Sequence, residues 1–365
     1  MHLCIHYVFS NTFIHTNLTF STSFGCFFLY NLIIYSYLKD IIDHREVTLN
    51  MENKRNASRL KRRKKKKKLL MLFFLIIVLL FLGILLYIFV EYQQSLKNSQ
   101  NGSSLQHENI KFNGVRNKSG KINILLLGID ARGKEKSRAD TIMIAQYDPE
   151  AKKFKIASIM RDSYVYIPGH GKNKINAAHA YGGPELLRKT IKNNFDIDIE
   201  YFILVDFKGF TKAIDKAFPE GIEINVEKEM SKGIGVTLHP GVQKLHGKEL
   251  LGYVRFRKDA ESDFGRVRRQ QEVLKQIIDE FISIKGIVKL PSVIGTIQPY
   301  ILTNIEYKQA LSILTSFLSS DTKNIDFFRI PVDESFEDVT YPQVGAVLDI
   351  DIEQNKKALK EFLYK

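Results

Sequence analysis

Residues 121–162 read KINILLLGIDARGKEKSRADTIMIAQYDPEAKKFKIASIMRD, and this stretch decides the fold class. It contains three short apolar runs, at 122–130, 141–147 and 154–160, rich in the residue types that favour strands. We interpret the three runs as successive strands of one sheet.

Strands and helices alternate along the rest of the chain. Apolar runs typical of strands recur at 203–206, 326–332 and 344–351. Helical periodicity recurs at 184–195, 208–218, 263–284, 307–318 and 353–364. Because such elements must bury one face each, we expect an α/β (α+β) sandwich in which a central mixed β-sheet is flanked by helices.

Residues 69–90, LLMLFFLIIVLLFLGILLYIFV, carry no charge and are long enough to cross a hydrocarbon core of roughly 30 Å. A soluble core helix of this length would show a polar stripe, and no small-residue cleavage signal follows. An uncleaved signal-anchor is therefore favoured over a removed signal peptide. The preceding segment, 51–68, has a net charge of about +10, so the positive-inside tendency predicts a single-pass type II protein with its later residues outside.

The formal net charge of +14 would suit an anionic partner, and the Lys-rich run could be a nucleic-acid patch. A basic cluster beside a membrane span already has a topological and anionic-lipid role, so we expect no nucleic acid. Both cysteines, Cys4 and Cys26, precede the cluster. The outer part of the chain therefore has no disulfide and no cysteine metal site.

The chain divides by composition into five parts. Residues 1–50 fit poorly with the rest, and we hypothesise that translation begins at Met51, because the codons for 45–47 can spell a purine-rich ribosome-binding sequence. The alternative is a genuine second span around 27–38. We expect the remaining parts to be a cytoplasmic segment at 51–68, a transmembrane helix at 69–90, a polar, structureless linker at 91–120, and a folded domain at 121–365.

Two aspartates flank the loop between the first two predicted strands. Asp130 ends the first run, Asp140 precedes the second, and Arg132 and Arg138 lie between them. Two carboxylates at strand boundaries can converge on Mg²⁺, with water and phosphate oxygens completing its shell. The alternative is an ordinary solvated turn with a capping Asp.

The third predicted strand ends in SIMRDS, which places Arg161 and Asp162 at a comparable edge. Open α/β sheets bind ligands at the carboxyl ends of their strands, so Arg161 is expected to point toward the same rim. In isolation this dipeptide would be an ordinary surface ion pair.

The strongest local signal is YVRFRKDAESDFGRVRRQQEVL at 253–274, in which five arginines surround Asp263. If 253–258 is extended, Arg255 and Arg257 share one face. If Asp263 caps the following helix, Arg266 lies one turn from Gln270, with Arg269 adjacent. Such converging guanidinium groups suit phosphate oxygens, and the alternative is a solvated basic helix face. The apolar stripe opposite is read first as core and second as a lipid pocket; it comprises Val267, Leu274, Ile277, Ile278 and Phe281.

Lys174 and Asn176 open a predicted helical stretch and could add donors to the same anion. His179 is interpreted as structural, because no second His or carboxylate sits at metal spacing from it. The chain contains no Walker loop, nucleophile elbow, zinc helix or dinucleotide fingerprint.

The successive motifs GIDAR, SRADTIM, SIMRDSYVYIP, KINAAHAYGG and VRFRKDAESDFGRVRRQQ resemble those of the LytR-CpsA-Psr family, in the same order and behind the same kind of anchor. The resemblance covers roughly 120–285 and implies a catalytic domain at 121–365, with a motif core at 121–285 and a C-terminal completion at 286–365. It implies transfer of a wall teichoic acid or capsular-type polymer from undecaprenyl diphosphate to a peptidoglycan muramyl hydroxyl, in a Gram-positive bacterium.

The resemblance also implies roles for individual residues. Asp130 and Asp140 would hold Mg²⁺ (or Mn²⁺). Asp263, as base or orienting carboxylate, would act with Arg255 and Arg257 in catalysis. The residues that would bind or neighbour the diphosphate are Arg132, Arg138, Arg161, Asp162, Lys174, Arg255, Arg257, Arg266, Arg269 and Gln270.

Two other functions fit parts of the sequence. A polyprenyl diphosphate hydrolase would use the same residues with water as the acceptor. A non-catalytic membrane-bound cell-wall regulator or wall-binding module is disfavoured by topology, because the Arg and Asp residues are expected outside, where no transcription factor could contact DNA. A pure glycan-binding surface would also favour exposed aromatic residues over clustered arginines.

Overall fold

The computed structural model describes residues 23–100, 110–130, 137–281, 284–319 and 325–365. The chain divides into two compact units, Met1–Gly83 and Ile84–Lys365. The described residues of the first unit all belong to one helix, α2 (Ser23–Gln100), which continues into the second unit. The doubtful region before Met51 is therefore helical from Ser23 onward, and the predicted span at 69–90 lies in the same helix.

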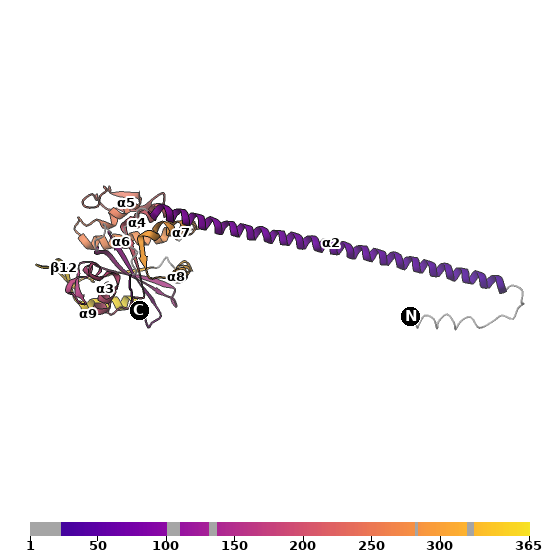
Figure 1. The fold of residues 1–365 in the computed structure, drawn as a ribbon, viewed down its shortest axis with the longest axis horizontal. Helices are drawn as coiled ribbons and strands as arrows, with labels where there is room; N and C mark the ends of the chain where they lie inside the picture. Colours follow the sequence, from indigo (N-terminus) through magenta and orange to yellow (C-terminus); the bar gives the residue numbers. More distant parts are fainter. Residues whose placement is uncertain (1–22, 101–109, 131–136, 282–283, 320–324) are drawn as a thin grey trace. The chain divides into compact units, whose positions relative to one another are not determined.

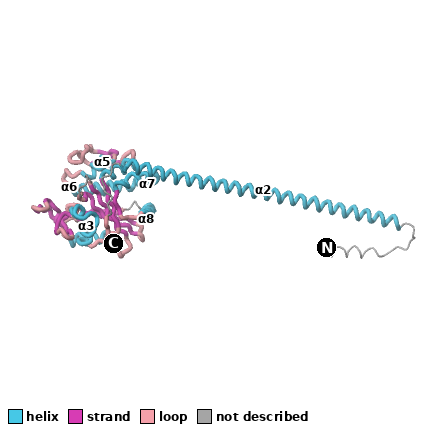
Figure 2. The backbone as a smooth tube through the Cα atoms, in the orientation of Figure 1, coloured by secondary structure: helices cyan, strands magenta, loops and turns pink. Residues whose placement is uncertain are grey.

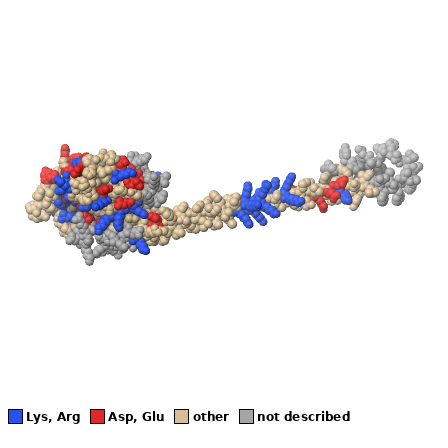
Figure 3. Space-filling view, turned by 90° about the horizontal axis from the view of Figure 1, so that it is seen from above, with Lys and Arg blue, Asp and Glu red and all other residues tan. Residues whose placement is uncertain are grey.

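Among the described residues, one helix is apolar enough to cross a membrane, and its most apolar window has a mean hydropathy of 3.4. The large apolar side chains of 69–90 are mostly exposed in the protein alone, as Leu70 (68%) and Phe74 (67%) illustrate. Figure 3 shows the Lys and Arg side chains of 51–68 as a blue band on this helix. A single apolar helix with this surface supports membrane anchoring.

The prediction of a structureless linker at 91–120 is wrong for its first part, because α2 continues to Gln100. The part of α2 from Ile84 onward belongs to the second unit and packs against α7 (Ile284–Ile297) within it. Ser95 Oγ lies 3.0 Å from Ser292 Oγ in a buried contact. A Cβ atom at Gly295 would lie 2.5 Å from a backbone oxygen of α2, so only glycine allows this approach.

The second unit is built on a six-stranded sheet with the order β10-β3-β2-β1-β6-β9. Its strands are β1 (Ile122–Ile129), β2 (Ala139–Asp148), β3 (Lys153–Ile159), β6 (Tyr201–Asp206), β9 (Ile301–Thr303) and β10 (Asp326–Ile330). β1 pairs antiparallel with β2 and parallel with β6, and β3 pairs antiparallel with β2 and parallel with β10. The sheet is mixed, as predicted.

Two smaller sheets and the remaining helices complete this unit. A four-stranded sheet has the order β11-β12-β4-β5, and β7 pairs with β8. These strands are β4 (Ser163–Ile167), β5 (Gly171–Lys174), β7 (Ile222–Val226), β8 (Gly241–Leu245), β11 (Phe336–Tyr341) and β12 (Gly345–Ile350). The helices are α3 (Ala177–Phe195), α4 (Phe207–Ala217), α5 (Gly247–Arg255), α6 (Ser262–Phe281), α7 (Ile284–Ile297), η1 (Gln298–Tyr300), α8 (Tyr307–Ser319) and α9 (Ile352–Tyr364).

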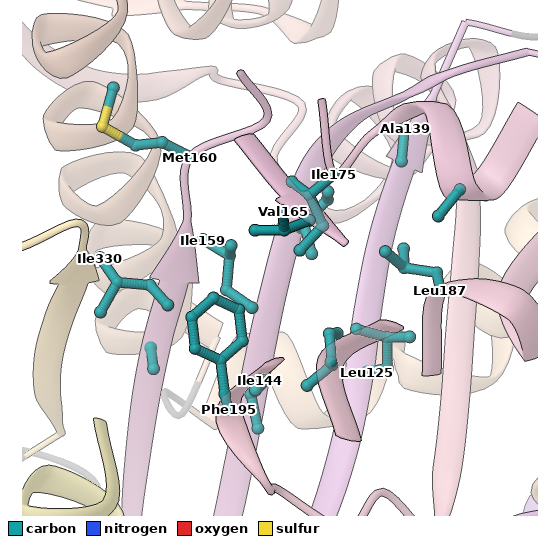
Figure 4. Close-up of a cluster of buried hydrophobic side chains, with 14 of the residues drawn as sticks. Leu125, Ala139, Ile144, Ile159, Met160, Val165, Ile175, Leu187, Phe195 and Ile330 are labelled. Carbon is teal, nitrogen blue, oxygen red and sulfur yellow. The ribbon is translucent and has the colours of Figure 1, made fainter. Parts of the chain in front are cut away.

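Helices cover both faces of the six-stranded sheet, as Figures 1 and 2 show: α3 and α9 lie on one side, and α4 to α7 on the other. The predicted sandwich with flanking helices is confirmed. The core beneath α3 contains Leu125, Ile144, Leu187 and Phe195 among its fully buried side chains (Figure 4). A second core joins α4, α5, β7 and β8.

The side chains of β1 point alternately to the two faces of the sheet, and both faces are apolar. Leu125, Leu127 and Ile129 belong to the core beneath α3. Leu126 and Gly128 line an apolar cavity on the opposite face. Because successive side chains of a strand point to opposite faces, a continuous apolar run is what this position requires.

The strands predicted at 122–130, 141–147 and 154–160 correspond to β1, β2 and β3. The helix predicted at 263–284 corresponds to α6 up to Phe281; residues 282–283 lie outside the described residues, and Ile284 is the first residue of α7. One local interpretation differs from the structure. The extended conformation considered for 253–258 is wrong, because Arg255 is the last residue of α5.

The carboxylate of Glu185 on α3 joins the segment before β1 to the domain. It accepts hydrogen bonds from the backbone and side chain of Asn113 at 3.0 and 3.1 Å, and from Arg188 at 2.8 and 2.9 Å. Burial alone would raise the pKa of Glu185, but these partners outweigh it and lower the pKa from 4.5 to about 2. The contacts therefore favour the charged form.

We expect Glu185→Gln to lower the free energy of unfolding at pH 7 by about 1–3 kcal/mol. Because the native pKa is depressed, this contribution is present above pH 4.5 and disappears as the pH falls toward about 2. Urea unfolding of both proteins across that pH range measures the difference. The exposed Glu353→Gln serves as a control with an expected change below about 0.5 kcal/mol, and a wild-type advantage that persists at pH 2 would contradict the assignment.

Candidate functional site

Three strand ends meet at one edge of the six-stranded sheet. Ile129 at the end of β1 pairs with Ala139 at the start of β2, which brings Asp130 and Asp140 to the same edge. β3 runs antiparallel to β2, so its carboxyl end reaches this edge as well. Arg161 follows β3 and donates a hydrogen bond from Nη1 to Asp140 Oδ1. The predicted convergence of these three residues is therefore present in the structure.

Arg161 is the centre of an ion-pair network. Besides Asp140, its Nε lies 3.4 Å from Asp162 Oδ2 and 3.8 Å from Asp263 Oδ1. Burial alone would lower the pKa of Arg161, but Asp162, Asp263 and Asp140 outweigh it and raise the pKa. The guanidinium group is thus held charged in a partly desolvated position.

Arg255 and Arg257 reach the same place from the end of α5 and the turn that follows it. Arg255 Nη2 lies 3.5 Å from Asp130 Oδ2, and its guanidinium lies 5.2 Å from the ring centre of Phe207. Arg257 Nη1 lies 3.6 Å from Asp263 Oδ1. The two side chains converge although the backbone is helical up to Arg255, so strand alternation is not what brings them together.

Asp263 lies in the first turn of α6, and its side chain is only 13% exposed. Its Oδ2 accepts a hydrogen bond from Arg266 Nη2 at 3.0 Å, while its buried Oδ1 has no hydrogen-bond partner among the described residues. Burial raises the pKa of Asp263 despite the opposing effect of Arg266 and Arg161. A buried carboxylate with a raised pKa and one oxygen that accepts no hydrogen bond is suited to accept a proton, although Arg161 and Arg257 lie within 3.8 Å of that oxygen.

The four arginines described above and Asp140 line a polar cavity of about 120 Å³, whereas Asp263 contacts three of these arginines but is not among the lining residues. Its lining residues are Asp140, Arg161, Phe207, Lys232, Gly233, Arg255, Arg257, Lys258, Arg266 and Gln270. Six of these ten are Lys or Arg, and one is acidic, so the cavity is suited to an anion. Sequence reasoning missed Lys232, which lies in the loop between β7 and β8, far from every motif; Lys258 was quoted but not selected.

An apolar cavity of about 240 Å³ lies between the sheet and the helices. The sheet contributes Leu126, Leu127, Gly128, Thr141, Met143, Ile203 and Val205, and the helices contribute Phe207, Phe210, Leu251, Val254, Gln270, Val273, Leu274 and Ile277. Phe207 and Gln270 line both cavities. The stripe on α6 that was interpreted first as core is divided: Val267 is core, whereas Leu274 and Ile277 line the cavity.

Arg269 does not join the cluster around the polar cavity. Its side chain is fully buried, donates to the backbone oxygen of Phe256 at 2.7 Å, and lies 3.1 Å from Asp259. The expectation that Arg269 neighbours the diphosphate is at odds with this position, and we assign it a structural role. Lys174 stands beside the cluster, since its Nζ lies 2.9 Å from Asp162 Oδ1.

Two other residues from the sequence analysis, Arg138 and His179, lie away from the lining of the polar cavity. Arg138 is exposed and is not among the residues that line the polar cavity. Arg132 lies outside the described residues. His179 Nδ1 lies 2.8 Å from the backbone oxygen of Ser137, and burial lowers the pKa of His179, which agrees with a structural role.

The donor set at the sheet edge fits Mg²⁺. Asp130 and Asp140 are partly exposed, and each faces an arginine of the cluster. Among the described residues no group of three or more His, Cys, Asp or Glu could enclose a metal ion. Mg²⁺ is commonly held by one or two carboxylates while water and substrate phosphates complete its coordination, so an aspartate pair beside a cationic cavity meets its preference.

A model of the LytR_cpsA_psr family matches residues 86–361. The chain is 49% identical over 253 residues to the regulatory protein MsrR of Staphylococcus aureus (strain COL), which covers 69% of this chain and 77% of the relative. It is 32% identical over 245 residues to the polyisoprenyl-teichoic acid–peptidoglycan teichoic acid transferase TagU of Bacillus anthracis (strain CDC 684 / NRRL 3495), covering 67% and 77%.

Among solved structures, the chain is similar to the LytR-CPS2A-psr family protein YwtF (TagT) of Bacillus subtilis with bound octaprenyl pyrophosphate lipid. The TM-score is 0.50 at 27% identity, and the match covers 68% of this chain and 93% of the other.

Proposed function

Because this chain belongs to the LytR_cpsA_psr family, we propose that it is a phosphotransferase that moves a glycopolymer from undecaprenyl diphosphate to a muramyl hydroxyl of peptidoglycan. The polymer would be a wall teichoic acid or a capsular-type polysaccharide. The observation that carries the proposal is the junction of a cationic cavity and an apolar cavity, which share Phe207 and Gln270. The naming of TagU as a teichoic acid transferase and the lipid in the TagT structure support it.

The two cavities match the two parts of a lipid-linked donor. A diphosphate is strongly anionic, and planar guanidinium groups bind its oxygens in pairs while they stay charged. Arg161, Arg255 and Arg266 would make these contacts in the polar cavity. The prenyl chain would lie between the sheet and α6, where burial of apolar surface stabilises it at about 25 cal/mol per Å².

The reaction then exchanges the phosphoanhydride bond of the donor for a new phosphate ester bond. The oxygen of the muramyl hydroxyl attacks the phosphorus that bears the polymer, and the bond from that phosphorus to the bridging oxygen breaks. Undecaprenyl phosphate leaves, and the polymer remains joined to the glycan by a phosphodiester. Arg161 and Arg255 stabilise the negative charge that accumulates on the phosphate oxygens during this step.

Asp263 would take the proton of the attacking hydroxyl. Its Oδ1 accepts no hydrogen bond, and burial raises the pKa of its carboxyl group toward the working pH, which supports this role. Arg257 and Arg266 flank the carboxylate and orient it.

Asp130 and Asp140 would hold Mg²⁺ (or Mn²⁺) beside the phosphate oxygens. When bound, such an ion supplies further charge stabilisation as a Lewis acid.

The apolar part of α2 would anchor the enzyme as a single-pass type II protein. The basic segment at 51–68 would stay in the cytoplasm, because positively charged flanks are retained there. The domain with both cavities would then face the cell wall, where peptidoglycan is available.

Reconstitution of the full chain with lipid-linked polymer, with and without peptidoglycan, tests the proposal. We expect a polymer–glycan phosphodiester only when peptidoglycan is supplied. Release of free phosphorylated polymer at the same rate in both samples would instead identify a diphosphate hydrolase. No turnover of the donor in either sample would favour a regulator without catalysis, as the name of MsrR suggests for that relative.

A further inference from the structure

The four-stranded sheet carries tyrosine rings on the face that points away from the core. Val165 and Ile167 of β4 are buried in the core beneath α3. Alternation along the strand therefore places Tyr164 and Tyr166 on the opposite face. Tyr166 is 46% exposed, far more than packing within the sheet requires.

Two of the rings on this face contact each other. Tyr164 stacks on Tyr341 of β11, with ring centres 4.8 Å apart and planes inclined by 29°. Tyr341 donates a hydrogen bond from its hydroxyl to Asp349 at 2.7 Å. Lys172 of β5 is exposed, and its Nζ lies 5.7 Å from the ring centre of Tyr164. We call the surface formed by Tyr164, Tyr166, Tyr341 and Lys172 the tyrosine face.

The tyrosine face leads directly to the polar cavity. Tyr164 pairs with Lys174 and Tyr166 with Lys172 across β4 and β5. Lys174 Nζ lies 2.9 Å from Asp162 Oδ1, and Asp162 Oδ2 lies 3.4 Å from Nε of the cavity arginine that precedes it. The row from Asp162 to Tyr166 spans roughly 13 Å at about 3.3 Å per residue. One end of the row therefore touches the site, and the other is open to solvent.

We propose that the tyrosine face is the docking surface for the acceptor, a strand of amino-sugar rings that bears carboxylate groups. This inference rests on the proposed function, because it assigns the second substrate of the same site. Flat rings on an exposed sheet suit the apolar C–H faces of sugar rings, which pack against the electron-rich face of a tyrosine. The positive charge of Lys172 complements the carboxylates of the muramyl and peptide groups. Because the tyrosine face continues to Asp162, a glycan strand bound along it would bring one of its hydroxyl groups to the polar cavity.

Binding of soluble, enzymatically released peptidoglycan fragments to the full chain in detergent micelles tests the assignment. We expect Tyr166→Ser to raise the Kd about five- to tenfold, because one exposed stacking ring is lost. Tyr166→Phe retains the ring and should stay close to the wild-type Kd. Tyr307→Ser is the matched control, since Tyr307 on α8 is 85% exposed and lies outside the tyrosine face. Equal Kd values for Tyr166→Ser and wild type would overturn the inference.

Kinetics separate this inference from the proposed function. In the transfer assay, Tyr166→Ser should raise the KM for the acceptor by a similar factor, while the KM for the lipid-linked donor stays unchanged. Transfer that proceeds with an unchanged acceptor KM would overturn the docking surface and leave the transferase intact. Fragment binding that depends on Tyr166 in a protein without transfer activity would support the surface and contradict the transferase.

Discussion

Replacing Arg255 by alanine is expected to lower the rate of polymer transfer by about tenfold or more, which corresponds to at least about 1.4 kcal/mol in the activation free energy. Arg255 lines the polar cavity and approaches Asp130 at 3.5 Å. The guanidinium group of Arg255 would contact the phosphate oxygens on which negative charge accumulates. Its removal should therefore raise the free energy of the transition state more than that of the bound ground state. The loss should appear mainly in kcat/KM for the lipid-linked donor.

Two further variants test whether the effect depends on the guanidinium group and on its position at the polar cavity. Arg255→Lys keeps the charge but loses the planar fork, and its rate should fall between those of wild type and Arg255→Ala. Arg268→Ala removes an arginine that contacts Glu227 and Glu261 and is absent from the polar cavity's lining, so its rate should stay near wild type. The free energy of unfolding of Arg255→Ala should also be near wild type, because this side chain is 32% exposed. An unaffected transfer rate would contradict the assignment.

The second large effect concerns stability. Arg269→Ala is expected to lower the free energy of unfolding by about 3–5 kcal/mol, because the buried carboxylate of Asp259 loses the positive charge of its buried partner. The side chain of Asp259 is 4% exposed and lies 3.1 Å from Arg269 Nη1. The variant also leaves the backbone oxygen of Phe256 without its donor.

The neighbouring Arg268 provides the matched control for this prediction as well. Its side chain is 43% exposed, so Arg268→Ala should change the free energy of unfolding by less than about 1 kcal/mol. Urea unfolding of the two variants and of wild type measures both values. Similar small losses for Arg268→Ala and Arg269→Ala would show that burial of Arg269 does not determine stability.

The contrast between these two arginines shows what the sequence could not reveal. Consecutive helical residues point about 100° apart, so one of them faces inward and the other outward. From the sequence, the arginines were interpreted as one cluster around Asp263. The orientation of α6, however, is set by its packing against the sheet. Only tertiary structure could separate Arg269 from Arg266, which lies against Asp263 at 3.0 Å.

The central strands were predictable because continuous apolar runs are what a sheet covered on both faces requires. α5 was missed, although its spacing of Leu250, Tyr253 and Val254 is helical and Glu249 completes a capping box with His246. The alternation of Arg255 and Arg257 was interpreted as the pattern of a strand instead. No sequence pattern pointed to Lys232, because only the tertiary structure brings this loop residue to the site.

The proposed transferase depends most on the joint use of the two cavities. A crystal structure of the full chain in detergent with a polyprenyl diphosphate tests this directly. We expect both phosphates within hydrogen-bond distance of Arg161, Arg255 and Arg266, and the prenyl chain against Leu126, Val205 and Leu274. Phosphates bound away from these arginines, or a prenyl chain on another surface, would contradict the account.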